Sequence, residues 1–201
     1  MSRTRPRHLA ANTQGTAGLE AALLLPVFVF FIVGAIELYQ HFRVKSLLDR
    51  AAYSVAHSVG TQRELYRDSP DCPVANDICV YGAVAADLFR PLNFQANGRL
   101  RITTYVAQNG AWQILPNSGW PADFGNALIS TGNVGNTNDL PGPVDDGESV
   151  VMVEALYQST PFALSSRFWE QLGGQSTLYS RAAFKPRYLD LHTLISAGSP
   201  P

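Results

Sequence analysis

The longest apolar run of the chain lies near its start. Between Leu19 and Tyr39 the only charged residues are Glu20 and Glu37, and no strongly polar side chain occurs from Ala21 to Ile36. A helix that crosses a bilayer needs about 20 residues. Apolar side chains on every face of a helix leave no polar stripe for water. The pattern therefore predicts a membrane-spanning helix, with a buried core helix as the alternative.

The helical pattern continues beyond this run. No proline or glycine interrupts residues 40–59, and Gly60 is a suitable stop signal. We expect one helix from about Leu19 to Val59, roughly 60 Å long at 1.5 Å per residue. Its outer half should pack on the chain's own globular domain, and the alternative is a partner helix. The apolar stripe comprises Leu47, Leu48, Ala51, Ala52, Val55, Ala56 and Val59.

The rest of the chain mixes short helical and strand patterns. Residues 100–107 alternate between apolar and polar side chains, and Asn109-Gly110 then favours a tight hairpin turn into residues 111–115. Residues 149–157 and 178–184 read as further strands. We therefore predict an α+β fold, in which the long N-terminal helix, its first half transmembrane, packs against a small antiparallel β-sheet domain.

Helices and loops fill the remaining segments. Residues 80–89 predict a short helix that ends before a proline, and residues 161–172 can form another. Residues 61–78 read as a loop, and everything after Pro186 reads as a tail. A long surface loop is expected at about 116–148, with a short helix near residues 124–129.

The charged residues of the chain indicate its class of partner and its orientation in a membrane. The net charge of the 201 residues is −1, which argues against a nucleic-acid binder. Arg3, Arg5 and Arg7 precede the apolar run without an acidic residue among them. Basic flanks tend to stay in the cytoplasm. We therefore expect the N-terminus in the cytoplasm and the rest of the chain outside it.

Candidate chemistry is sparse. Two cysteines, Cys72 and Cys79, are too few for a structural zinc site and predict a local disulfide outside the cytoplasm. No histidine pair has metal-ligand spacing, and no nucleophile motif occurs. We therefore name no catalytic residue, metal, cofactor or small-molecule substrate. Four acidic residues of the long loop could bind calcium but lack the alternation of an EF-hand, so solvated turns are favoured: Asp139, Asp145, Asp146 and Glu148.

Three explanations of the N-terminus compete. One is a plain signal anchor. Another is a secretory signal peptide, cut after the small residues of Val33-Gly34-Ala35. The third is cleavage after Gly15, which would leave a free amine on Thr16 about one helical turn from Glu20. A carboxylate in a membrane segment is costly and marks a functional residue. The amine of a neighbouring subunit would neutralise it.

The third arrangement resembles the prepilin signature of type IV-like pilins, with a short basic leader, Gly15 at the cut and Glu20 at the fifth mature position. The closest similarity is to TadE/TadF-type pseudopilins of the tight-adherence (Tad, or Flp) pilus. The residues that carry it in the span are Glu20, Pro26, Gly34 and Glu37. Two further runs resemble TadF more than TadE: D-R-x-x-Y-S at residues 49–54 and R-E-L-Y at residues 63–66.

The resemblance implies an organisation and a role. Residues 1–15 would be a prepilin-type leader, 16–39 the transmembrane helix, 40–60 its extracytoplasmic continuation and 61–201 the α+β domain. The chain would be a minor pilin of the bacterial inner membrane, with the bilayer, a prepilin peptidase, other Tad pilins and the inner-membrane platform as partners. A signal-anchored extracytoplasmic binding module is the alternative. A secreted enzyme has no residue constellation to support it.

Overall fold

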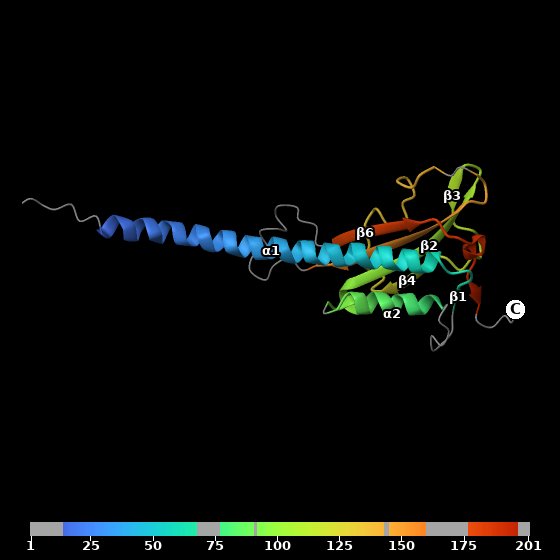
Figure 1. The fold of residues 1–201 in the computed structure, drawn as a ribbon, viewed down its shortest axis with the longest axis horizontal. Coiled ribbons are helices and arrows are strands. Elements are labelled where there is room, and N and C mark those ends of the chain that lie inside the picture. The colour runs from blue at the N-terminus through green and yellow to red at the C-terminus, as the bar shows by residue number, and fades with distance from the viewer. Residues whose placement is uncertain (1–13, 68–76, 91, 143–144, 160–176, 197–201) are drawn as a thin grey trace, which may run out of the picture. The chain divides into compact units, whose positions relative to one another are not determined.

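The computed structural model describes residues 14–67, 77–90, 92–142, 145–159 and 177–196 (Figure 1). The chain divides into a unit Met1–His41 and a unit Phe42–Pro201. Helix α1, Gln14–Gly60, has 47 residues and contributes to both. The predicted long helix is thus confirmed, and it ends at Gly60 as expected. Pro26 lies inside α1 without ending it.

The second unit is built on an antiparallel sheet in the order β3-β2-β5-β6, with β4 also paired to β2 (Figure 1). The predicted hairpin and the two later strands are confirmed. Asn109 and Gly110 both have positive φ, which the tight turn between β2 and β3 requires. The strands are β2 Gly98–Gln108, β3 Ala111–Gln113, β4 Ala122–Gly125, β5 Ser149–Gln158 and β6 Thr177–Phe184.

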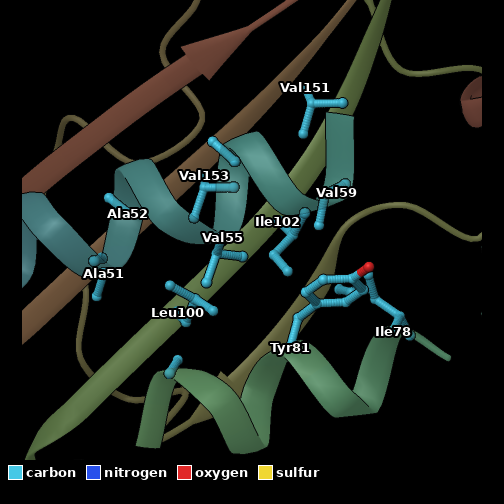
Figure 2. Packing of buried hydrophobic residues seen from close by; sticks show 14 of the residues in the cluster. Ala51, Ala52, Val55, Val59, Ile78, Tyr81, Leu100, Ile102, Val151 and Val153 are labelled. Atoms are coloured by element: carbon cyan, nitrogen blue, oxygen red, sulfur yellow. The ribbon is translucent and has the colours of Figure 1, made fainter. Parts of the chain in front are cut away.

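The main core lies between this sheet and two helices. In Figure 2, Val55 and Val59 of α1 point toward Leu100 and Ile102 of β2, and Tyr81 approaches from α2. The predicted helical stripe therefore packs within its own chain: Leu48, Ala51, Ala52, Val55, Ala56 and Val59 are all buried, and Leu47 is half-buried. The short helices are α2 Ile78–Leu88, α3 Phe94–Asn97 and the 3-10 helix η1 Leu189–His192.

The opposite face of the sheet is also covered. Tyr105, Val150 and Met152 form a second cluster there, with Leu140 of the long loop packed against it. Strand β5 is consequently buried on both faces from Ser149 to Tyr157. Residues of the long loop lie over the sheet, because Gly135 and Asn136 form hydrogen bonds with Glu154 of β5 and Arg181 of β6.

Two sequence-based expectations were wrong. The short helix expected near residues 124–129 does not form, because residues 122–125 form β4 on the pairing edge that β2 offers from Arg99 to Ile102. The expected loop at 61–78 and the expected tail are joined by a short parallel pair, β1 Tyr66–Arg67 with β7 Ile195–Ser196. Such pairing between distant segments leaves no periodic signal in either one. The helix expected at 161–172 lies outside the described residues.

Candidate membrane-anchor and assembly segment

The apolar part of α1 is exposed on all its faces. An 18-residue window of this helix has no buried residue and is apolar enough to cross a membrane, a test that a signal sequence near an N-terminus also meets. Side chains as large as Phe28 and Phe31 are 69% and 68% exposed. Such a surface is far more apolar than water tolerates on a monomer, so a bilayer or other helices must cover it. The exposed large residues are Leu19, Leu23, Leu24, Leu25, Val27, Phe28, Val29, Phe30, Phe31, Ile32, Ile36, Leu38 and Tyr39.

The predicted processing residues lie at the start of α1. Gly15 and Thr16 belong to its first turn, where backbone N–H groups have no acceptor within the helix. Thr16 and Glu20 are four positions apart, which puts both positions on one face of the helix. The Glu20 side chain is exposed. The local geometry thus offers a carboxylate to a neighbouring molecule one turn after the predicted cut.

The other predicted packing residues differ in their surroundings. A Cβ atom placed on Gly34 would meet nothing within 4 Å, and the same holds for Gly18, which was not among the predicted residues. Another helix can therefore approach the backbone closely at these positions. Glu37, in contrast, is only 7% exposed. The two carboxylates that bracket the apolar run therefore have different environments, and of the two only Glu20 is exposed.

The outer half of α1 is tied to β6 by polar contacts that were not predicted. Asp49 accepts hydrogen bonds from the Ser180 hydroxyl and from Lys45 Nζ, which also donates to the Tyr179 carbonyl at 2.7 Å. Burial opposes ionisation of Asp49, but these hydrogen bonds and the charge of Lys45 outweigh it and lower the pKa of the carboxyl. The sequence feature that could have pointed to these contacts is the D-R-x-x-Y-S run, which begins at Asp49.

A second polar centre lies under the long loop. Glu154 of β5 is fully buried and accepts bonds from the Gly135 amide at 2.9 Å and from the Tyr179 hydroxyl at 2.8 Å. Its cross-strand neighbours are Arg101 and Arg181. Burial, together with the Glu154 carboxylate, raises the pKa of Tyr179. An acidic residue inside the apolar run of β5 was the available sequence signal for this centre.

Two of the acidic residues considered for calcium binding form ion pairs within the domain. Asp139 pairs with Arg181 at 2.6 Å and Glu148 with Lys185 at 2.5 Å. Among the described residues, no group of three or more His, Cys, Asp or Glu side chains is arranged to hold a metal ion. Cys79 is the second residue of α2, and Asp77 caps its amide. Cys72 lies outside the described residues, so its pairing with Cys79 stays a prediction.

The exposed apolar helix coincides with the region that resembles a known family. Residues 15–57 match the family model described as TadE-like protein. The resemblance to TadE/TadF-type proteins is thereby confirmed. The matched region contains Gly15, Glu20, Pro26, Gly34 and Glu37, and it ends three residues before the end of α1.

The TadE-like match covers residues 15–57 and no more of the chain. It relates the chain to Tad pilus proteins, which are structural pilus components rather than enzymes. Membership of such a family implies contacts with other pilus components. The match covers the helix and does not extend to the sheet domain. No curated protein and no solved structure matches the chain. The single apolar N-terminal helix of the described residues is compatible with a single-pass membrane anchor.

Proposed function

We propose that this chain is a minor pilin, or pseudopilin, that is needed to assemble or initiate a Tad pilus. The observation that carries the proposal is the coincidence of three features in the TadE-like segment. The helix is apolar, it is exposed on every face, and it presents the Glu20 carboxylate one turn after Thr16. A plain anchor gains nothing from a carboxylate at that depth, whereas an assembling helix can use it.

The mechanism begins with insertion. The leader with Arg3, Arg5 and Arg7 stays in the cytoplasm, residues 16–39 cross the inner membrane, and the domain is delivered to the periplasm. A prepilin peptidase then cuts after Gly15. The cut falls in the first turn of α1, where few backbone hydrogen bonds have to open before a protease can bind an extended strand.

Cleavage creates the group that Glu20 needs. A charged side chain within a membrane segment costs about 3 kcal/mol on insertion scales. The new Thr16 ammonium of a neighbouring subunit offsets this cost when it meets the carboxylate, so pairing favours the packed state over the single helix. Gly18 and Gly34 allow the helices to approach closely. The globular domain would present its surface to other pilus components and to the inner-membrane platform.

The experiment that tests the proposal is the mass of the mature N-terminus, measured on protein from its own membranes. Cleavage after Gly15 gives a chain that starts at Thr16, and Gly15→Ala should abolish that product. A chain that starts at Ile36 would overturn the proposal, because the protein would then be secreted without its apolar helix.

An intact leader in cells that contain the native peptidase would favour a second candidate function. The chain would then be a signal-anchored extracytoplasmic binding module. The observation in its favour is that the TadE-like match ends within the last turn of α1 and does not extend into the sheet domain. Within the family, the D-R-x-x-Y-S run at residues 49–54 and the R-E-L-Y run at residues 63–66 favour a TadF-like protein over a TadE-like one.

A further inference from the structure

Aromatic and basic side chains gather where α1 ends. Tyr53 and Tyr188 are 63% and 44% exposed. The side chains of His57, Arg63 and Arg187 are exposed as well. We call this surface the helix-end patch, and its six members are Tyr53, His57, Arg63, Phe184, Arg187 and Tyr188.

Ring contacts and a backbone hydrogen bond connect these residues across the two segments. The His57 ring stacks on Tyr53 at 6.2 Å between centroids and meets the edge of Phe184 at 5.3 Å. The Arg63 guanidinium lies 5.8 Å from the centre of the Tyr188 ring. The Arg187 amide donates to the carbonyl of Gly60, the last residue of α1. The patch is therefore built by two segments far apart in the chain.

The composition of the patch is that of a binding surface. Tyrosine and arginine dominate the energetic centres of protein interfaces, because they combine a large apolar area with fixed polar groups. None of the six residues carries a carboxylate. Glu64, which follows Arg63, accepts a hydrogen bond from the Tyr66 hydroxyl. The patch thus fits a partner that presents carboxylates.

Such a partner surface adjoins the patch on the same molecule. Asp145 and Asp146 are exposed on the turn before β5, and Glu148 of that turn pairs with Lys185, the residue after Phe184. A hollow of about 460 Å³ lies between the turn and the chain after β6, lined by Asp145, Asp146, Gly147, Glu148, Ser149, Lys185 and Pro186. The basic helix-end patch therefore lies next to the acidic hollow, and the Lys185–Glu148 ion pair lies between them.

We infer that the helix-end patch binds a second copy of this chain. Two-fold pairing makes the same surface face itself, so every contact occurs twice. The basic patch of one copy would lie on the Asp145–Asp146 turn of the other, and the reverse. Opposite potentials that face each other in this way steer association and fix its register. The inference goes beyond the proposed function, because it does not depend on cleavage after Gly15.

The first measurement is a photocrosslink from position 53. A photoreactive phenylalanine replaces Tyr53 in the full chain, which carries two distinguishable tags and stays in its membranes. Light should give a product of twice the chain mass that contains both tags. A product of another mass would mean that a different protein covers the patch, and the absence of any product would mean that nothing does. Either result overturns the inference.

Charge reversal separates this contact from packing in the membrane. Reversing the patch with Arg63→Glu and Arg187→Glu, or reversing the turn with Asp145→Arg and Asp146→Arg, should each lower the crosslinked fraction about tenfold. Co-expression of the two variants should restore a mixed product, because both of their contacts again join opposite charges. Packing through the apolar helix alone would leave all three fractions equal and would overturn the inference.

Two controls keep the result interpretable. Arg90→Glu reverses an exposed arginine that follows α2, outside the helix-end patch, and it should leave the crosslink unchanged. Thermal unfolding of each variant in detergent should stay close to that of the parent chain, since all four reversed residues are exposed. The mature N-terminus, measured on the same samples, reports separately on the proposed pilin function.

Discussion

The carboxylate of Asp49 on α1 accepts a hydrogen bond from the hydroxyl of Ser180 on β6, 131 positions further along the chain. Lys45, one turn earlier on the helix, pairs with the same carboxylate at 3.0 Å and also reaches the backbone of β6. The outer half of the helix is thus fastened to the sheet by polar contacts as well as by its buried apolar stripe. A force or displacement acting on this half of the helix would pass to the sheet through these residues.

We expect Asp49→Asn to cost about 1 kcal/mol of unfolding free energy, since the bonds are charge-assisted but partly exposed. The pKa of Asp49 is lowered in the folded chain. Its contribution to stability is therefore complete above the ordinary aspartate pKa and is lost as the pH falls through the lowered value. Unfolding curves of the full chain in detergent, from pH 6 down to about pH 2, measure this. The variant should lose less stability in acid than the parent.

Asp87→Asn is the matched control, because Asp87 pairs with Arg90 on an exposed helix surface, where both side chains are mostly in solvent. Its acid curve should follow that of the parent. Equal acid curves for Asp49→Asn and the parent would mean that the Asp49 bonds contribute nothing to the folded state.

The buried Glu154 predicts a larger effect. Glu154→Ala removes the acceptor of the Gly135 amide and the Tyr179 hydroxyl, and should cost about 3 kcal/mol. Tyr179→Phe removes one of these bonds and should cost about 1 kcal/mol. Hydrogen exchange of the Gly135 amide should accelerate in Glu154→Ala, because that amide loses its partner. Exposed Glu64→Gln is the control, and protection of Gly135 that survives in Glu154→Ala would contradict the assignment.

Local sequence patterns were sufficient to predict those helices and strands whose apolar residues recur with a regular period. The alternation of residues 100–107 predicted β2, Asn109-Gly110 predicted its turn, and the apolar stripe of residues 47–59 predicted how α1 packs. Strand β4 and the β1–β7 pair could not be predicted in this way. They are too short to show a period, and their hydrogen-bond partners lie far away in the chain.

The last residue of β4, Gly125, offers a test of that strand. Gly125 has a φ of +82°, and a Cβ atom on it would come within 2.4 Å of the Gly98 carbonyl oxygen. Gly125→Ala should therefore destabilise the chain by about 2 kcal/mol or more, because both the backbone conformation and the contact are unfavourable. Gly142→Ala, whose Cβ would meet nothing within 4 Å, is the control. Denaturant unfolding monitored by tryptophan fluorescence compares the two variants, and equal midpoints would contradict the close packing of β4 on β2.

The functional residues also differ in how far the sequence alone could identify them. Glu20 stood out in the sequence because a carboxylate in an apolar run has a cost that needs a reason. Glu154 gave a similar signal inside β5, but its partners Gly135 and Tyr179 could not be named before the loop and sheet were seen together. The helix-end patch could not be recognised in the sequence, since His57 meets Phe184, and Arg63 meets Tyr188, only in the folded chain.

The exposed Glu20 carries the last prediction. Glu20→Ala and Glu20→Gln remove the charge from the apolar segment, so membrane insertion should be intact or improved. Assembly should nevertheless be impaired, because the Thr16 amine of a neighbouring subunit would lose its partner. The measurements are the amount of chain in the membrane fraction and the number of pili per cell. Glu64→Gln, an exposed carboxylate in the domain, should change neither. Normal piliation in both Glu20 variants would refute the pairing role, even if cleavage after Gly15 still occurs.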